Sequence, residues 1–340
     1  MPTLTKASEE TKEILKWGGL FIAGIFVFFV LLRIVLYVKD LFFPTPPPKP
    51  TVAFGFLPPQ IFPENSTNAK LTYSLNTLTG DTPSLQNQTK VYQILQPQSD
   101  LLALSRTQDM VTPLGFNSKS TALSNRIFEW STSDSKDIKI DIINHNFIFT
   151  YPYLSDPNVL SVTNLDTNQA ILTAKNMLSI MQLFYSDIDL SKTKTVSYSI
   201  SNNRLIPATS LSDTQIVQVS FIQNDFDNLP IYYDNPNSSS MTLLVSTDKV
   251  VGASFLHQSV SDQLATYPIK TSKQAYQELQ QGKGYIASYG GSTSVTIRNI
   301  FLAYYMSGNL QQFLMPIFVF QGDNGFYAYV PAVTDVWISK

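Results

Sequence analysis

The chain has 340 residues, of which 44% are hydrophobic and 14% are charged, whereas roughly a quarter of the residues are charged in ordinary globular proteins. Its 23 basic and 25 acidic residues give a formal net charge of −2 and no long run of like charges, which excludes a nucleic-acid-binding protein. The absence of cysteine excludes disulfides and thiolate chemistry.

Residues 17–38 form an apolar run interrupted by one charge, Arg33. A helix of this length, rising about 1.5 Å per residue, crosses a hydrocarbon core of roughly 30 Å. Trp17 and Tyr37 stand where interfacial aromatic residues belong. A cleaved signal peptide is the alternative, but the run is long and no small-residue cleavage site follows it. We therefore expect a retained signal-anchor, a single-pass transmembrane helix at 17–38 after a tail at 1–16.

The sequence gives only a weak indication of which end of this anchor faces the cytoplasm. Lys6, Lys12 and Lys16 precede the run, while Lys39 and Lys49 follow it, so the excess of positive charge on the N-terminal side is small. The C-terminal part carries few charges and many Ser, Thr, Asn and Gln residues, as exported β-rich domains often do. We expect a protein of the cell membrane with a cytoplasmic N-terminus and an extracytoplasmic C-terminal domain.

A proline-rich linker is expected at 39–60, where 43–50 read FPTPPPKP. Proline fixes φ and lacks an N–H donor, so this segment predicts a polyproline II spacer. A ligand for a proline-reading domain is the alternative. The prolines at 58, 59 and 63 are expected to cover the first edge of the folded part.

A first α+β unit is expected at 61–155. Apolar residues that alternate with polar ones predict strands at 71–75, 138–142 and 147–151, the last two joined as a hairpin through Asn144-His145-Asn146. A short helix is expected over 99–110.

The second unit, 156–265, and the third, 266–340, each begin with a capped helix. Asp166 caps one helix with Gln169 three residues later, and Thr271 opens a capping box for the other, which ends at Gly282. In each unit a strand through a proline follows, at 229–233 and 315–320, and then a closing strand at 241–245 and 326–330. This degenerate repeat predicts an α+β fold, a transmembrane helix followed by tandem helix-on-antiparallel-sheet units.

Five segments carry a resemblance to a known family: 215–223, 229–233, 243–245, 300–305 and 315–318. Their strands resemble the "F-x-Q … P-I-Y" and "LAYY … P-x-W/F" patterns of YycI-like and PepSY-like bacterial envelope modules, over roughly residues 160–340. The resemblance implies a curved sheet behind a helix. It also implies a single-pass regulator that holds a sensor histidine kinase in check. The segment FGFLPPQIFP is similar to uncharacterised envelope proteins of candidate-phylum bacteria.

The residues that carry chemistry form no recognisable constellation. His145 lies in a predicted turn, and His257 has no second histidine or carboxylate at ligand spacing. Asp225 and Asp227 suggest the start of a calcium loop, but its glycine and its bidentate glutamate are missing, so only weak calcium binding there is left open. We expect no enzyme, no cofactor and no metal site. An enzyme would require residues of the set Asp225, Asp227, His145 and His257 to converge in one cleft.

Two features point to a binding partner. The first is Arg33 inside the apolar run, which either snorkels to the headgroups or pairs with an acidic residue of a partner helix. Gly19 and Ala23 form a small-x-x-x-small pair that could admit such a partner. The second is the aromatic content of the last unit. Its residues either fill a second layer or form an exposed contact patch: Tyr304, Tyr305, Phe326, Tyr327 and Tyr329.

The sequence therefore predicts a membrane-anchored, non-catalytic binding protein of the bacterial cell envelope. Regulation or scaffolding of an envelope protein complex is the leading hypothesis. Its expected partners are the lipid bilayer and a membrane or envelope protein. A tethered module that binds cell-wall or surface glycan is the alternative.

Overall fold

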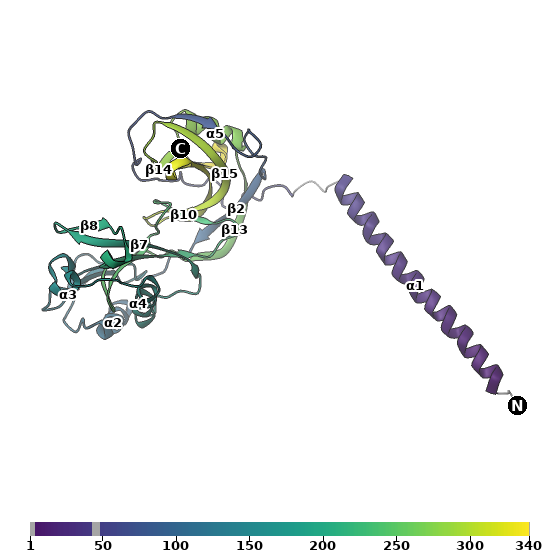
Figure 1. The fold of residues 1–340 in the computed structure, drawn as a ribbon, viewed down its shortest axis with the longest axis horizontal. Coiled ribbons are helices and arrows are strands. Elements are labelled where there is room, and N and C mark those ends of the chain that lie inside the picture. Colours follow the sequence, from purple (N-terminus) through teal and green to yellow (C-terminus); the bar gives the residue numbers. More distant parts are fainter. Residues whose placement is uncertain (1–3, 43–47, 340) are drawn as a thin grey trace. The chain divides into compact units, whose positions relative to one another are not determined.

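The computed structural model describes residues 4–42 and 48–339 of the chain (Figure 1). It divides into two compact units, Met1–Lys49 and Pro50–Lys340. The expected polyproline spacer falls mainly on residues 43–47, which lie outside the described part.

The first unit is a single helix, α1 (Leu4–Phe42), drawn in purple in Figure 1. Its stretch Lys16–Lys39 has a mean hydropathy of 2.7 over its most apolar window, which is 0% buried. One apolar helix of spanning length, compatible with a single-pass membrane anchor, is therefore present near the N-terminus.

The second unit contains a nine-stranded sheet in which every pairing is antiparallel. Its strands, in spatial order, are β3 (Thr121–Ala122), β4 (Ile127–Ser131), β5 (Asp137–Asp141), β6 (Phe147–Thr150), β12 (Lys249–Phe255), β11 (Met241–Ser246), β9 (Ile216–Gln223), β7 (Ile188–Ser201) and β8 (Arg204–Pro207).

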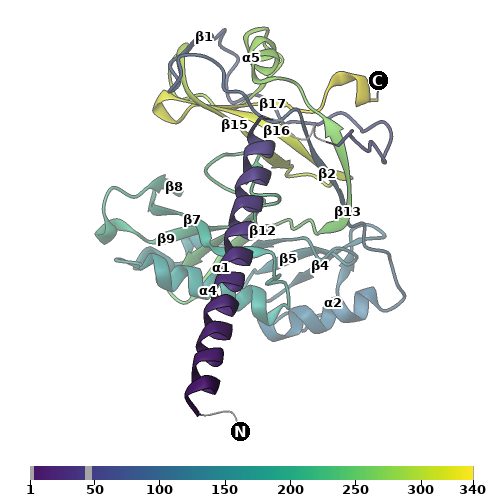
Figure 2. The same cartoon turned by 90° about the vertical axis from the view of Figure 1, so that its right-hand side faces the viewer.

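Helices cover one face of this sheet (Figure 2). α4 (Thr167–Ile180) packs on β9, β11 and β12, and α2 (Ala103–Val111) contributes to the same hydrophobic core. The small residues Ala170 and Ala174 are fully buried and let α4 lie close to the strands. The shorter helices of the second unit are α3 (Pro157–Leu160), η1 (Thr112–Leu114), η2 (Tyr153–Ser155), η3 (Leu211–Asp213), η4 (Asp323–Gly325) and η5 (Asp335–Trp337).

An eight-stranded sheet forms the rest of this unit. Its main path is β1 (Thr72–Leu75), β15 (Ser294–Met306), β16 (Phe313–Gly322), β17 (Tyr327–Pro331) and β14 (Tyr285–Ser288), with β10 (Ile231–Tyr233) also on β15, and β2 (Gln88–Ile94) between β16 and β13 (Val260–Pro268). β1 and β10 run parallel to β15, and the other pairs are antiparallel. α5 (Ser272–Gln280) packs on β17.

The α+β class and several local predictions are confirmed. The predicted hairpin is β5–β6, which pairs Ile138 with Phe149, and its turn holds His145 at a φ of 57°. The Asp166 side chain accepts from the Gln169 N–H at 2.9 Å at the start of α4. Both hydrogen bonds of the predicted capping box at Thr271 are present in α5.

The expected order of three consecutive units does not match the sheets. β1 and β2 lie in the segment assigned to the first unit, yet they pair with β15, β13 and β16 in or next to the third. β5 and β6, from the same segment, join the nine-stranded sheet through β12. Strand partners are chosen by burial of complementary faces over long sequence separations, which local patterns do not encode.

The expected correspondence of 229–233 with 315–320 is also wrong. β16 is a central strand with neighbours on both sides. β10 has only three residues and pairs with β15 of the eight-stranded sheet, whereas β9 and β11, its neighbours in sequence, belong to the nine-stranded sheet. The predicted helix at 99–110 begins at Ala103 rather than at residue 99, because the Asp100 carboxylate forms a local turn in which it accepts from the Leu102 N–H at 2.7 Å.

Residues 50–66, called here the strap, run along the eight-stranded sheet. The Val52 N–H donates to the Thr266 carbonyl at 3.0 Å, and Leu57 forms a parallel bridge with Ile338. The Ser66 N–H donates to the Ile286 carbonyl at 2.9 Å, which covers the edge strand β14. The strap thus connects the folded unit to the linker that follows α1.

Candidate functional site

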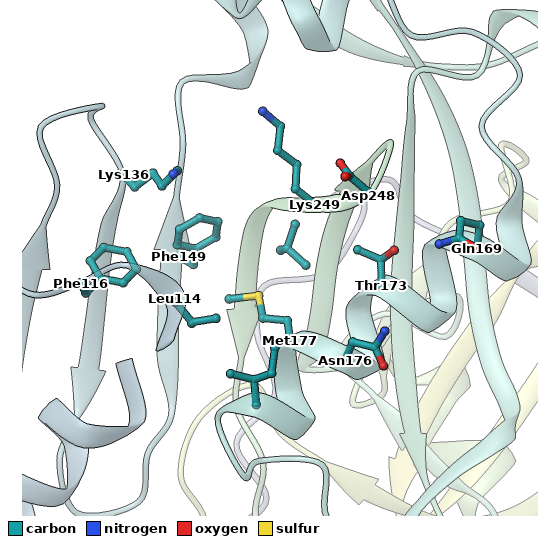
Figure 3. Close-up of a pocket in the computed structure, with 12 residues that line it drawn as sticks. Leu114, Phe116, Lys136, Phe149, Gln169, Thr173, Asn176, Met177, Asp248 and Lys249 are labelled. Atoms are coloured by element: carbon teal, nitrogen blue, oxygen red, sulfur yellow. The ribbon is translucent and has the colours of Figure 1, made fainter. Parts of the chain in front are cut away.

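A groove of about 470 Å³ lies between α4 and the segment that follows α2, and we call it the α4 groove (Figure 3). Its floor is apolar and comes from both helical segments and from β6 and β12: Leu114, Phe116, Phe149, Met177, Ile180 and Val250. Cavities of this size and make-up are in the range of ligand-binding pockets, about 300–1,000 Å³.

The rim of the α4 groove is polar and carries Lys136, Lys249 and Asp248, with Asp248 next to Lys249 in Figure 3. Lys136 pairs with Asp134 at 2.6 Å, and Lys249 lies 3.3 Å from Asp156. Hydrogen bonds from the Tyr151 hydroxyl and the backbone N–H of residue 158, together with Lys249, lower the pKa of Asp156 to about 2. The groove combines an apolar floor with charged residues at its mouth, an arrangement suited to binding.

A second cavity, also of about 470 Å³, is lined by segments from both sheets, and we call it the junction pocket. Both histidines of the chain line it. Its lining residues come from the end of β2, the start of β4, the β5–β6 turn, the connection from α4 to β7, the β12–β13 connection and the β15–β16 turn: Ile94, Leu95, Gln96, Pro97, Arg126, Ile143, Asn144, His145, Tyr185, His257, Gln258, Ser259 and Leu310.

The His257 ring contacts Asp187 and Tyr185, and Gln223 supports Asp187. Its Nε2 lies 2.9 Å from one carboxylate oxygen of Asp187, and its ring stacks on Tyr185 with 3.9 Å between centroids. Gln223 Nε2 donates to the same carboxylate at 2.8 Å. Burial raises the pKa of Asp187, but the hydrogen bond and charge of His257, with the Gln223 amide, outweigh it, so the pKa lies below its usual value.

His145 lies across the pocket in the β5–β6 turn. Burial lowers the pKa of its imidazole, the nearby Asp141 opposes this shift, and Arg106 reinforces it. Asp141 in turn accepts from Arg126 Nη2 at 2.7 Å. The imidazole of His145 therefore gains a proton less readily than a histidine in water.

The structure brings together only part of the set that catalysis would require. The two histidines share the junction pocket, whereas Asp225 pairs with Lys192 at 2.8 Å and Asp227 pairs with Lys90 at 2.6 Å. Among the described residues, no group of three or more His, Asp or Glu side chains is arranged to hold a metal ion.

Of the two arrangements that the sequence left open for the aromatic residues of the last unit, the exposed contact patch is wrong. Four of its members, Tyr304, Tyr305, Phe326 and Tyr329, are at most 1% exposed, and Tyr327 is half-buried. Tyr305 and Tyr329, with Tyr327 beside them, fill a second layer on the eight-stranded sheet, as the other alternative predicted. Tyr304 and Phe326 belong to two other hydrophobic clusters. The rings that cover the second layer from outside are Phe62 of the strap, which stacks on Tyr285, and Tyr232 of β10, 5.8 Å from Tyr329.

The other predicted partner-binding residues, Gly19, Ala23 and Arg33, lie exposed on α1. A Cβ added at Gly19 would have no neighbour within 4 Å. Their role stays a prediction. Sequence reasoning missed the junction pocket because Asp187 and His257 are 70 residues apart.

No protein-family model and no curated protein matches this sequence. Among solved structures, an uncharacterised protein from Eubacterium rectale is similar, with a TM-score of 0.43 and 13% identity over 80% of this chain and 92% of the other. The C-terminal domain of Bacillus megaterium YpeB is similar with a TM-score of 0.34 and 14% identity over 71% of this chain and 95% of the other. Similarity at this level supports no conclusion about function, so the resemblances found in the sequence stay predictions.

Proposed function

We propose that this protein is a non-catalytic, membrane-anchored regulator or scaffold of an envelope protein complex. In this proposal the N-terminus is cytoplasmic and the unit Pro50–Lys340 is extracytoplasmic. The observation that carries it is the apolar helix α1, whose exposed spanning residues include one cation, Arg33.

Arg33 supports a partner within the bilayer. A charge at the centre of a span costs about 2.5–3.5 kcal/mol on insertion scales, and the cost is smaller for Arg33 because it lies nearer the C-terminal end of the run. Pairing with an acidic side chain of another helix would lower it further. Gly19 and Ala23 are four residues apart, so they lie on one face of α1 and permit close approach of a second helix.

The α4 groove supports a second contact, outside the bilayer. Its apolar floor fits an apolar side chain of a partner, and the charged residues Lys136, Lys249 and Asp248 at its mouth can pair with polar or charged neighbours in the partner sequence. A regulator that binds through both places would sense the partner in the bilayer and outside it.

Photo-crosslinking of the full-length chain in its native host, followed by mass spectrometry, tests the proposal. We expect wild type and Arg33→Lys to capture one membrane-protein partner. Arg33→Leu and a version with an unrelated anchor helix should lose it. If all four versions recover the same partner, α1 does not recognise it, and the proposal of regulation through the bilayer is wrong.

A separate variant tests the groove. Asn176→Trp places a bulky side chain at its mouth, while Ser179→Trp places the same side chain on an exposed position of α4 outside the groove lining. We expect only the first to weaken capture of the partner.

Binding of cell-wall or surface glycan was the alternative. An exposed aromatic patch would have supported either a glycan or a protein contact, and the burial of Tyr304, Tyr305, Phe326 and Tyr329 removes that support from both. Recovery of wall material by every version in the crosslinking experiment would nevertheless favour glycan binding over regulation.

A further inference from the structure

We propose that the junction pocket binds a small organic anion, a carboxylate attached to an apolar body. This inference does not depend on the proposed function. It rests on the charge of the lining, the free donors in it and the apolar wall opposite them.

The lining is one-sided in charge. Its titratable side chains include Arg126, His145 and His257, and no Asp or Glu belongs to it. The two nearby carboxylates are already engaged, Asp141 with Arg126 and Asp187 with His257. Arg126 is the cation of this lining, and no lining carboxylate opposes an anion beside it.

Arg126 can receive the carboxylate of the ligand. Its Nη2 donates to Asp141 at 2.7 Å, yet its side chain remains 41% exposed, so part of the guanidinium faces outward. Its Nε is buried and has no hydrogen-bond partner among the described residues. A ligand carboxylate can therefore reach the outward Nη end of the guanidinium rather than its Nε, and a guanidinium binds carboxylates through two parallel N–H donors.

Asn144 adds a neutral donor to the same pocket. Its side-chain oxygen accepts from the Asn146 N–H at 3.0 Å, which fixes the orientation of the amide and leaves its NH2 group to donate elsewhere.

Apart from Gln96, Gln258 and Ser259, the remaining wall is apolar and accommodates the body of the ligand. It consists of aliphatic and proline side chains and the Tyr185 ring: Ile94, Leu95, Pro97, Ile143, Leu310 and Tyr185. A volume of about 470 Å³ accepts a ligand with a ring or a short branched chain.

A bound ligand would contact segments of both sheets. The polar link between them passes through Gln258, whose side-chain oxygen accepts from the Gln311 N–H at 2.8 Å and whose amide donates to the Ser307 carbonyl at 3.2 Å. Because the pocket uses segments of both sheets, the ligand should stabilise their arrangement as well as each segment.

The two histidines provide the test, since the chain contains no others. The full-length protein, isotope-labelled at histidine Cε1 and held in lipid nanodiscs, gives one NMR signal for each. We would titrate phenylacetate and, as a neutral match of the same shape, phenylacetamide, at constant pH. We expect phenylacetate to shift both signals saturably and phenylacetamide to shift neither.

Two variants sharpen the result. Arg126→Gln should weaken phenylacetate binding by at least about tenfold, because a charge-assisted contact is lost. Arg298→Gln removes an arginine that pairs with Asp323 at 2.8 Å outside the pocket, and it should bind like wild type. Leu310→Trp, at an exposed turn, should block the pocket without disturbing the Arg126–Asp141 pair.

Three outcomes would overturn the proposal: unmoved histidine signals with phenylacetate, equal shifts with both probes, or full affinity in Arg126→Gln. Circular dichroism of each variant separates a lost site from a lost fold. If Arg126→Gln fails to fold, Leu310→Trp decides, because retained binding in that variant places the ligand elsewhere.

Discussion

Tyr305 and Tyr329 lie side by side in the same buried aromatic layer, with 6.2 Å between their ring centroids, yet their hydroxyl groups are in opposite situations. The Tyr305 hydroxyl donates to the carboxylate of Asp234. The Tyr329 hydroxyl is buried and has no hydrogen-bond partner among the described residues. Burial raises the pKa of both, so both remain protonated at neutral pH.

This difference predicts opposite results for the same substitution. Tyr329→Phe removes an unsatisfied buried hydroxyl, so the free energy of unfolding should stay the same or rise by about 1 kcal/mol. Tyr305→Phe leaves Asp234 with fewer donors and should lower it by about 1–3 kcal/mol. Urea unfolding followed by circular dichroism measures both. A larger loss of unfolding free energy in Tyr329→Phe than in Tyr305→Phe would show that the Tyr329 hydroxyl, and not that of Tyr305, is the one that is hydrogen-bonded.

Lys270 should stabilise the attachment of α5. Its side chain is 9% exposed and lies 2.9 Å from Glu278 of α5 and 2.8 Å from Asp335 of η5. Lys270→Met leaves these carboxylates without their cation, so the free energy of unfolding should fall by about 1–3 kcal/mol. Lys273→Met, at an exposed position of the same helix, should change it by less than about 0.5 kcal/mol.

The two ion-pair partners of Lys270, Glu278 and Asp335, should not contribute equally to the free energy of unfolding. Asp335 is 82% exposed and Glu278 is 20% exposed, so water screens the first pair more strongly. Glu278→Gln should therefore lower the free energy of unfolding, measured in urea, more than Asp335→Asn does. Equal effects would mean that exposure does not set the strength of these pairs.

The capping box of α5 predicts a loss of about 1 kcal/mol in Thr271→Ala, because the Thr271 hydroxyl accepts from the Gln274 N–H at 3.2 Å. Thr271→Ser keeps an oxygen acceptor in the same place and should remain near wild type. Thermal unfolding of the three proteins checks the order. A Thr271→Ser variant as unstable as the alanine variant would show that the methyl group, not the hydroxyl, is what matters.

His145 should make stability depend on pH. Because burial lowers the pKa of its imidazole in the folded protein, the unfolded chain takes up the proton more readily, near the ordinary value of 6.5. The stability it contributes is therefore present above pH 6.5 and is lost as the pH falls through that value toward the lower folded pKa.

His145→Asn removes this group and keeps a residue that tolerates the positive φ of the turn. Urea unfolding at about pH 7.5 and about pH 5.5 should show that the variant loses less stability on acidification than wild type. Identical pH dependence in the two proteins would show that His145 titrates normally.

Caps and hairpins were predictable from the sequence, but the pairing of strands that are distant in sequence was not. The caps at Asp166 and Thr271 and the β5–β6 hairpin depend on residues close in sequence, and each is present. The parallel pairing of Thr72 with Ser294 has no local signal, because it depends on which apolar faces meet after collapse.

The candidate site shows the same limit. Alternation in the last strands indicated that aromatic side chains face both sides of the sheet, but not that Phe62 of the strap covers them. His257 looked isolated because its carboxylate partner, Asp187, comes from a distant segment. The α4 groove and the junction pocket arise only where several such segments meet.

The attachment of the strap determines where tension from the bilayer would enter the folded unit. The Thr51 N–H donates to the Thr266 hydroxyl at 2.8 Å, Val52 bonds to the backbone of the same residue, and the Ser339 N–H donates to the Leu57 carbonyl at 2.8 Å. A pull along the chain after α1 therefore loads β13 and the final residues first. β13 begins at Val260, directly after the stretch that carries His257, so such a pull would act on a strand that leads out of the junction pocket.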